Sequence, residues 1–299
     1  MKSINRNRIK SNDEIAVRLF AIFSVAVFCI LILIPLIMMI SMSFETEDNI
    51  IKYGFSILPR DFSLDAYKFL FRDSQIFDAY KVTIFTTVVG TVLSMLLTLT
   101  LAYGLARPEL KLTTPITFFV YFTMLFSGGL VPTYLLISKY LGMRDDIWVL
   151  IIPSLFNAWN MFLMRNFLKS IPDALIESAH IDGANDMQIL FKIILPLAVP
   201  GIATISLFYA LSYWNQWYNA MLYIDNKKLY PLQYLIMNLV RTSDYIKEMS
   251  KQTGVAAADL PSNSLKMATT VVAVGPIILL YPFVQKYFTS GLTVGAIKG

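Results

Sequence analysis

The stretch between residues 170 and 200 reads SIPDALIESAHIDGANDMQILFKIILPLAVP. Ser170 is a candidate helix cap, because Pro172 would fall inside the first turn and Asp173 stands three residues after the cap. Further along, Gly183 breaks the helical pattern and permits a sharp turn. The first half of the stretch therefore predicts a short helix followed by a bend.

The second half of the same stretch is amphipathic. Its apolar side chains are Met187, Ile189, Leu190, Ile193 and Ile194. Pro196 and Pro200 mark the place where we expect the chain to re-enter a membrane, so the pattern predicts a second helix lying on the membrane surface. On these residues alone, an interfacial helical hairpin with solvated charges explains the stretch without any specific partner.

Long apolar runs surround this stretch on both sides. Hydrophobic residues make up 56% of the 299 residues and charged residues only 15%, against about 25% charged in an ordinary soluble domain. A chain of this composition needs lipid as a second solvent, and a run of about 18 residues without ionisable groups is long enough to cross the bilayer. Six runs qualify: Leu19–Phe44, Val82–Ala106, Thr114–Ser138, Ile147–Met164, Leu197–Ile224 and Met267–Gln285. The sequence therefore predicts an all-α integral membrane protein with six transmembrane helices, forming one helical membrane domain over residues 1–299 with an insert at residues 170–196.

The orientation follows from the basic N-terminal residues, which should stay in the cytoplasm. These are Lys2, Arg6, Arg8, Lys10 and Arg18. Six crossings then put both termini inside, and they put the loops Glu45–Asp78, Lys139–Asp146 and Asp225–Lys266 outside. The first run is longer than the apolar part of a secretory signal and no small-residue cleavage site follows it, so we expect it to remain as an anchor.

Several classes of protein are disfavoured by what the runs lack. None of the six carries an ionisable residue in its interior, whereas ion-driven carriers usually need one there. The chain also has no phosphate-binding loop and no convincing nucleophile–base pair, so we expect no catalytic residues and no bound cofactor. The single cysteine, Cys29, and the single histidine, His180, have no metal-ligand spacing, and the basic charge is not interleaved with aromatics as in nucleic-acid binders.

Polar and aromatic residues inside two of the runs are candidates for a translocation path. In the fifth run these are Tyr209, Tyr213, Gln216, Trp217 and Asn219, and in the fourth run they are Asn157 and Asn160. Aromatic faces and neutral hydrogen-bonding groups suit a solute that has apolar faces and many hydroxyl groups. The alternative is that these groups bond between helices or sit at the membrane interface. In the third run, Gly128, Gly129 and Pro132 should interrupt the helix, either as a kink beside a pore or for tight packing.

The insert resembles the cytoplasmic signature of ABC importer permeases. That family pattern begins Glu-Ala-Ala, has glycine four residues after the second alanine and later carries Ile-x-Leu-Pro; here it reads Glu177-Ser178-Ala179, then Gly183, then Ile193 to Pro196. Ser178 replaces an alanine, a change of small residue for small residue. The fuller string through Asp182, Gly183 and Ala184 is similar to the carbohydrate branch of the family.

Three further segments resemble permeases that import plant or algal polysaccharide fragments in Gram-positive and related bacteria. They are Phe126–Tyr134, with the sequence FSGGLVPTY, Trp214–Trp217, with WNQW, and Gly295–Gly299, with GAIKG. In role the chain is similar to the shorter of the two permeases of maltose importers.

This resemblance implies the type I ABC importer fold, with the insert as a coupling helix. It implies a second permease in a heterodimer, two cytoplasmic ATPase subunits that bind ATP and Mg²⁺, an extracellular sugar-binding protein and a sugar substrate, in the bacterial cytoplasmic membrane. Carried over, Glu177 would pair with a basic ATPase residue, Ala179 and Ala184 would allow close approach, and Gly183 would permit the bend. The tail ending in Lys298 and Gly299 would contact the ATPase. Which sugar is carried stays open between polysaccharide fragments and simple disaccharides, and the rival hypotheses are a secondary carrier and a membrane enzyme.

Overall fold

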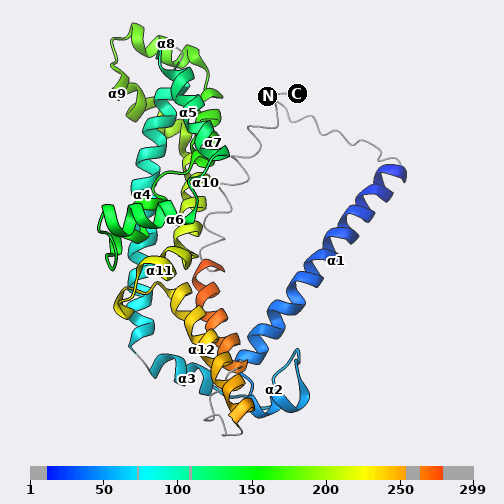
Figure 1. The fold of residues 1–299 in the computed structure, drawn as a ribbon. Coiled ribbons are helices and arrows are strands. Elements are labelled where there is room, and N and C mark those ends of the chain that lie inside the picture. The colour runs from blue at the N-terminus through cyan, green and yellow to red at the C-terminus, as the bar shows by residue number, and fades with distance from the viewer. Residues whose placement is uncertain (1–11, 73, 108–109, 254–262, 279–299) are drawn as a thin grey trace. The chain divides into compact units, whose positions relative to one another are not determined.

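The computed structural model describes residues 12–72, 74–107, 110–253 and 263–278 (Figure 1). Over these ranges the regular secondary structure is helical, apart from an isolated bridge between Glu45 and Phe62. It divides into two compact units, residues 1–72 with 247–272 and residues 73–246 with 273–299. The α-helices are α1 (Asn12–Ser43), α2 (Glu47–Tyr53), α3 (Asp65–Arg72), α4 (Gln75–Ala106), α5 (Thr113–Leu125), α6 (Leu130–Leu135), α7 (Ala158–Lys169), α8 (Asp173–Ile181), α9 (Asp186–Ile189), α10 (Leu195–Trp214), α11 (Tyr218–Tyr223) and α12 (Leu232–Thr253). Short 3-10 or π-helical turns are η1 (Leu136–Tyr140), η2 (Ile147–Leu150), η3 (Ile152–Ser154), η4 (Leu190–Ile194) and η5 (Lys227–Leu229), and a further apolar helix covers Asn263–Ile278.

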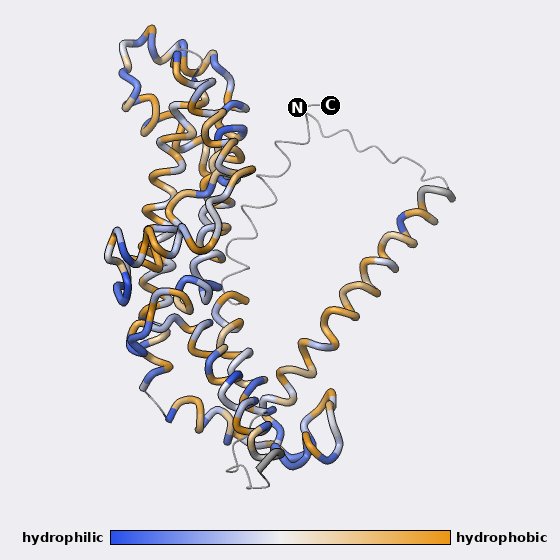
Figure 2. The backbone as a smooth tube through the Cα atoms, viewed as in Figure 1, coloured by the Kyte–Doolittle hydropathy of each residue, from blue (hydrophilic) through white to orange (hydrophobic). Residues whose placement is uncertain are grey.

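In the first unit, α1 is an apolar helix whose side chains are mostly exposed within the chain. Its segment Ile15–Ser43 is long and apolar enough to cross a membrane, and Figure 2 shows hydrophobic residues along most of its length. The exposed side chains are large and apolar, from Val17 to Ile40. Such a surface is stable only against lipid or another protein, which agrees with the first expected span.

The segment after α1 was expected to be an outer loop, but it contains α2 and α3. Its centre is Glu45, which is only 4% exposed and accepts hydrogen bonds from the amides of Arg60 (2.7 Å) and Asp61 (3.1 Å) and from Asn49 (3.0 Å). Burial acts to raise the pKa of the Glu45 carboxyl, but these hydrogen bonds outweigh it and hold the pKa below its ordinary value of 4.5. The sequence did not predict these helices because they are short and lack a long apolar period.

In the same unit, the Glu47 carboxylate binds the start of the helix Asn263–Ile278. It accepts hydrogen bonds from the amide and side chain of Asn263 and from the amide and hydroxyl of Ser264, all between 2.8 and 3.1 Å. A carboxylate at this place satisfies amides that have no partner in the first helical turn. The expected sixth span, Met267–Gln285, falls within this helix as far as residue 278, and its remainder lies outside the described residues.

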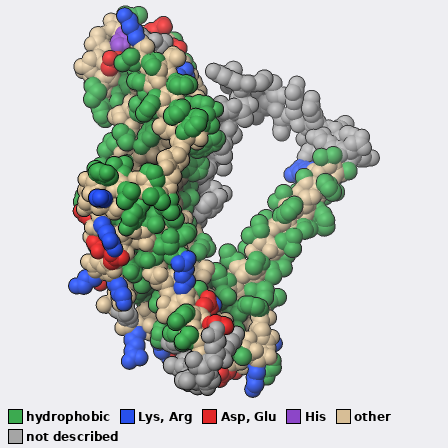
Figure 3. All heavy atoms as spheres, in the orientation of Figure 1, with side chains coloured by type: hydrophobic (Ala, Val, Ile, Leu, Met, Phe, Trp, Pro, Cys, Tyr) green, Lys and Arg blue, Asp and Glu red, His purple; other side chains and the backbone are tan. Residues whose placement is uncertain are grey.

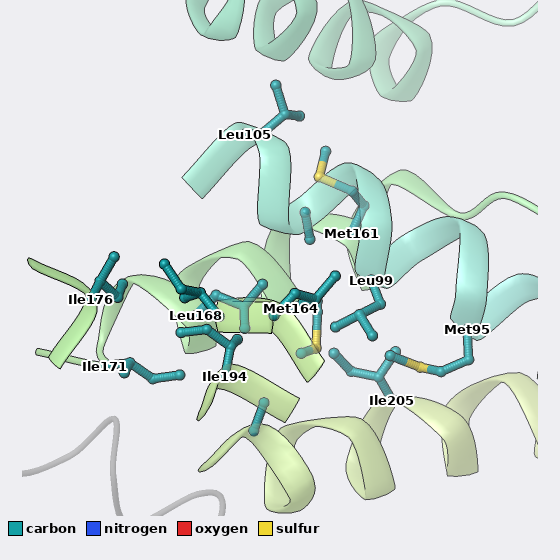
Figure 4. Close-up of a cluster of buried hydrophobic side chains, with 14 of the residues drawn as sticks. Met95, Leu99, Leu105, Met161, Met164, Leu168, Ile171, Ile176, Ile194 and Ile205 are labelled. Atoms are coloured by element: carbon teal, nitrogen blue, oxygen red, sulfur yellow. The ribbon is translucent and has the colours of Figure 1, made fainter. Parts of the chain in front are cut away.

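The second unit is built around α4, which packs against α7 and α10 (Figure 4). Its core holds Met95 and Leu99 from α4, Met161 and Met164 from α7, and Ile205 from α10. Two glycines allow close approach between these helices. A Cβ atom on Gly90 of α4 would come within 2.6 Å of the Tyr213 ring, and one on Gly201 of α10 within 2.7 Å of the Phe167 ring.

The third and fourth expected spans are each broken in two. Helix α5 and the segment Leu130–Tyr140 meet at 111° across residues 126–129, where Gly129 has φ +85°. The expected interruption at the glycines is therefore confirmed, while Pro132 lies inside α6. The fourth span consists of Ile147–Ser154 and α7, bent by 51°, and it continues to Lys169 beyond the expected end at Met164.

The expected bounds of the fifth span, Leu197–Ile224, are wrong at both ends. One continuous helix runs from Asp186 to Trp214, through α9, η4 and α10, so no break marks re-entry at Pro196. The π-helical turn η4 directly precedes Pro196, which stands in the first turn of α10. Such a wide turn accommodates a residue that has no amide hydrogen to donate.

Two segments outside the membrane-length helices have defined local structure, and the first of them differs from expectation. The segment Asp225–Lys266 was treated as a loop, yet it contains the amphipathic helix α12. The loop after η1 is tied to the residues after α11 by Asp145, whose carboxylate accepts from the amides of Asp225 (2.6 Å) and Asn226 (2.8 Å). These bonds hold the pKa of Asp145 below its ordinary range and stabilise its left-handed backbone, with φ +57°.

Among the described residues, three helices are long and apolar enough to cross a membrane, or five if each bent pair is one span. This all-helical arrangement agrees with the expected fold class.

We predict that Gly90→Ala destabilises the packing of α4 on α10. The new methyl group would overlap the buried Tyr213 ring, and overpacking of this kind costs about 1–3 kcal/mol. Gly104→Ala is the matched control, because it lies in the same helix with nothing within 4 Å of its Cβ position. Thermal unfolding in detergent should show a lower midpoint for Gly90→Ala alone, and equal midpoints would contradict the account.

A second prediction concerns pH and Glu45. The pKa of Glu45 is lower in the folded chain than its ordinary value of 4.5, so the ionised carboxylate stabilises the fold fully at pH values above 4.5. This stabilisation is lost as the pH falls through the pKa of the folded chain. Amide exchange protection over residues 44–63 should therefore fall below about pH 4. Glu45→Gln, which cannot ionise, should show protection that does not change over this range; a wild-type profile equally flat would rule out the role of the carboxylate.

Candidate functional site

The insert begins where α7 ends, and Ser170 has a different role from the one expected. Its hydroxyl donates to the Phe167 carbonyl at 2.6 Å, and its amide donates to the same carbonyl. Ser170 therefore closes the C-terminus of α7. Helix α8 starts at Asp173 after Pro172, which has extended backbone angles and makes no side-chain cap. The expectation that Ser170 caps α8 is wrong, because the serine bonds backward instead of forward.

The turn after α8 is a Schellman motif formed by signature residues. The Ala184 amide donates to the Ala179 carbonyl and the Gly183 amide donates to the His180 carbonyl, both at 3.0 Å. Gly183 has φ +81°, which glycine adopts without strain. The expected bend at Gly183 is confirmed, and Ala184 closes the same turn.

The remaining signature residues divide between an inner and an outer face. Ala179 is buried in the core cluster of this unit, and Ala184 packs partly buried against that cluster. The small residue at 179 thus allows α8 to approach this chain's own helices. Glu177, Ser178 and Asp182 are exposed, and the Ser178 hydroxyl donates to the Ala174 carbonyl.

Large apolar side chains accompany these polar ones on the exposed surface of the insert. Ile181 is 86% exposed, and Met187, Phe191 and Leu175 are also exposed. Figure 3 shows charged side chains gathered at this end of the second unit. Exposed apolar residues rimmed by charges are typical of a surface that another protein covers.

The second arm of the insert starts with a capping box. Asn185 accepts from the Gln188 amide (2.9 Å), and the Gln188 side chain accepts from the Asn185 amide (3.0 Å). From there the helix continues into α10, so the second arm of the insert is a direct extension of α10, while the first arm, α8, follows α7 after the turn at residues 170–172.

The end of α4 lies against this insert. The Arg165 Nε donates to the Leu105 carbonyl at 2.9 Å, and the Arg107 guanidinium donates to the Tyr103 hydroxyl at 2.5 Å. A cleft of about 580 Å³ lies here between the end of α4 and the insert, lined by Tyr103, Gly104, Arg107, Leu110, His180 and Asp186. The ion pairs across it, Arg107–Asp186 at 3.9 Å and His180–Asp186 at 3.8 Å, are long and involve an exposed carboxylate, so each contributes little.

Two candidate path residues, Tyr209 and Tyr213, lie inside the helix packing. They are 2% and 1% exposed. The Tyr209 hydroxyl lies 2.7 Å from the Thr98 hydroxyl, and the Tyr213 hydroxyl lies 2.9 Å from the Ser94 hydroxyl. This is the arrangement that hydrogen bonding between helices requires. Ser94 and Thr98 were not singled out from the sequence, although their spacing of four residues matches that of the tyrosines.

Gln216 and Trp217 do not continue the face of Tyr209 and Tyr213, because α10 ends at Trp214. The Asn215 side chain bonds back to the Leu211 carbonyl at 2.9 Å, while Trp214 donates to the Ala273 carbonyl at 3.1 Å. These bonds fix the helix end and overturn the expectation of one continuous face. Gln216 is half-buried, and no group in the described residues bonds its Oε1; Trp217 is 40% exposed.

The candidate asparagines lie close to the broken fourth span. Asn157 is the N-cap of α7 and accepts from the Asn160 amide at 3.0 Å, and Asn160 is buried. Asn219 of α11 donates to the Ser154 hydroxyl at 3.4 Å. This contact connects α11 with the first half of the broken fourth span. Lys298 and Gly299 lie outside the described residues, and within the described ranges no group of three His, Cys, Asp or Glu side chains is placed to hold a metal.

Known proteins are similar to this chain along most of its length. The model of a family described as "Binding-protein-dependent transport system inner membrane component" matches residues 13–294. A solved structure of a bacterial ABC transporter involved in the import of the acidic polysaccharide alginate matches with a TM-score of 0.81 and 32% identity, covering 94% of this chain and 99% of that one.

Two curated relatives come from Bacillus subtilis strain 168. The polygalacturonan/rhamnogalacturonan transport system permease protein YtcP is 43% identical over 272 residues, which are 91% of this chain and 94% of the relative. The arabinooligosaccharides transport system permease protein AraQ is 26% identical over 279 residues, covering 90% and 92%.

We predict that substitutions at Gly183 loosen the end of α8 in the order Asn, Ala, Val. A Cβ atom there meets nothing within 4 Å, so the cost is backbone strain alone, about 1–2 kcal/mol for a residue other than glycine and less for asparagine. Amide exchange at Ala184, whose donor bond to Ala179 closes the turn, should rise in that order. Equal exchange in the valine variant and the wild type would contradict the Schellman assignment.

Proposed function

Since the chain belongs to the family of inner membrane components of binding-protein-dependent transport systems, we propose that it forms half of the translocation pathway of an ATP-driven importer for oligosaccharides. Permeases of this family work with a partner permease, an ATPase and a substrate-binding protein. The chain is then a transport subunit, and ATP with Mg²⁺ is bound by the partner ATPase.

The observation that carries the coupling role is the exposed surface of the insert. Glu177 points away from the core next to exposed apolar residues, of which Ile181 is the most exposed. The complementary surface on the ATPase would be a groove that has apolar walls and carries a basic residue. Residues 170–196 then form the coupling insert, and Ala179 contributes by seating α8 on its own bundle.

The insert's position implies the topology of the complex. If the ATPase docks on it, the insert is cytoplasmic, and the segment Glu45–Asp78 is extracellular, where it is available to a sugar-binding protein. Both termini are then cytoplasmic. The proposed assembly is a heterodimer of two permeases with two ATPase subunits in the bacterial cytoplasmic membrane, with the tail around Lys298 and Gly299 contacting the ATPase.

The sugar class is supported by the relatives' names. One is named for polygalacturonan and rhamnogalacturonan, another for arabinooligosaccharides, and the solved relative is involved in alginate import. We propose fragments of such polysaccharides as the substrate. Gln216, Trp217 and Asn219 are the proposed contacts, because they follow the end of α10, where Trp217 is exposed and the buried Gln216 Oε1 has no hydrogen-bond partner among the described residues. Asn157 and Asn160 supply neutral groups nearby, while Tyr209 and Tyr213 contribute through packing.

We expect Glu177→Arg to uncouple the importer. The chain is reconstituted in vesicles with its second permease, ATPase and binding protein, and ATP-dependent uptake of oligogalacturonides, alginate oligomers and maltose is measured. Reversing the charge should abolish attraction to a basic ATPase residue, so uptake and stimulated ATP hydrolysis should both fall at least tenfold.

Lys139→Glu is the control, since it reverses an exposed charge on η1, outside both the insert and the segment Glu45–Asp78. Uptake unchanged by Glu177→Arg would remove the coupling role of this residue. Sugar uptake without any ATPase subunit would overturn the proposal that the chain belongs to an ATP-driven importer and would favour a secondary carrier.

A further inference from the structure

Two tyrosines of α10 connect it to both α4 and the break in the fourth span. Tyr209 and Tyr213 are four residues apart, so they share one face of α10. On α4 they meet Thr98 and Ser94, which are also four residues apart, at 2.7 and 2.9 Å. Each hydroxyl has a second partner on the bent segment Ile147–Lys169. The Asn157 amide donates to Tyr209 at 3.2 Å, and Tyr213 donates to the Ile151 carbonyl at 3.3 Å.

These second partners lie on opposite sides of the bend. Asn157 precedes the first turn of α7, where an amide has no helical acceptor. Ile151 stands at the junction of η2 and η3. A break within a membrane segment is stable only where its backbone groups find other partners. Tyr209 supplies the acceptor for the Asn157 amide, and Tyr213 adds a second donor to the Ile151 carbonyl, which also accepts from the Ser154 amide at 3.1 Å.

Each tyrosine hydroxyl, with its partner on α4 and its partner on the bent segment, forms what we call a bridge. Counting hydrogens fixes the direction of the hydrogen bonds in one of the two bridges. A carbonyl oxygen only accepts, so the single hydroxyl hydrogen of Tyr213 goes to Ile151, and Ser94 must donate to Tyr213. In the other bridge the Asn157 amide is the donor, which leaves the Tyr209 hydrogen for Thr98 or the Thr98 hydrogen for Tyr209. Both bridges are therefore satisfied without water.

The packing leaves the tyrosines little room to move. Both rings are almost fully buried, and Gly90 supplies the space into which the Tyr213 ring fits. The bridges join the two segments that lead into the insert, since α7 is followed by α8 after a short turn and the continuous helix from Asp186 leads through α10.

We propose that Tyr209 and Tyr213 are positioning residues that transmit movement of the insert to the outer part of the bent fourth span. The bridges join α4, α10 and both sides of the bend, so that the two arms move together and carry residues 147–154 with them. Without the hydroxyls the bend is released, and movement of the insert is no longer passed on. This inference rests on the proposed function.

The test is the double variant Tyr209→Phe with Tyr213→Phe in the reconstituted complex. It removes both hydroxyls and keeps both rings. The ratio of sugar imported to ATP hydrolysed should fall about fivefold or more, while ATP hydrolysis continues. The loss of one hydrogen bond changes an equilibrium constant by roughly that factor. A structural role alone would lower both rates with the amount of complex and leave their ratio unchanged.

Matched controls isolate the hydroxyl groups. Tyr140→Phe removes a hydroxyl from a side chain that is 76% exposed, and Thr98→Ser keeps the α4 hydroxyl; both should retain the wild-type ratio, whereas Thr98→Val should lower it. If the double variant does not assemble, the two single variants are read in the same way. An unchanged ratio in the assembled variants overturns the inference.

A second readout separates this inference from the proposed function. Exchange of the Asn157 amide is measured in the wild type and in Tyr209→Phe, and it should rise about fivefold when its acceptor is lost. No rise would overturn the inference even in a complex that imports sugar. A wild-type complex that imports none of the sugars would count against the proposed function, while a rise in exchange would still support the bridge.

Discussion

In the hydrocarbon of a bilayer no water is available to bond the backbone groups that a broken helix releases. This constraint explains much of the second unit, because two of its apolar segments are bent. At the bend of Ile147–Lys169 the partners are the hydroxyls of Tyr209 and Tyr213, held in turn by α4. Gly90 is then needed for space rather than for flexibility, since any side chain there would displace the Tyr213 ring.

The insert shows how one short motif serves two surfaces. Ala179, Gly183 and Ala184 form the turn and the inner contact, so their small size is explained by this chain alone. Glu177 and Ile181 have no such explanation, because both point outward. The partner ATPase that we propose would cover these exposed side chains. The helix that runs from Asp186 to Trp214 without a break would connect this partner directly to α10.

The membrane class, the break at Gly129 and the turn at Gly183 could be predicted from the sequence, because apolar length and glycine act locally. The fifth span could not be bounded in this way, since the helix continues through the π-helical turn before Pro196 back to the capping box at Asn185, and side-chain bonds of Asn215 set its other end. Helix α12 was missed because amphipathic helices lack the apolar length used to find spans. The partners of Tyr209 and Tyr213 depend on tertiary packing, which single-residue patterns do not contain.

The most direct test of the docking surface is site-specific photocrosslinking. A photoreactive amino acid is placed at Ile181 of the insert and, as a control, at Leu58, which is 76% exposed in the segment expected to lie outside. In cells that contain the whole importer, Ile181 should give a covalent product with the ATPase subunit and Leu58 should not. Absence of an ATPase product from Ile181, with the complex assembled and importing sugar, would contradict the account.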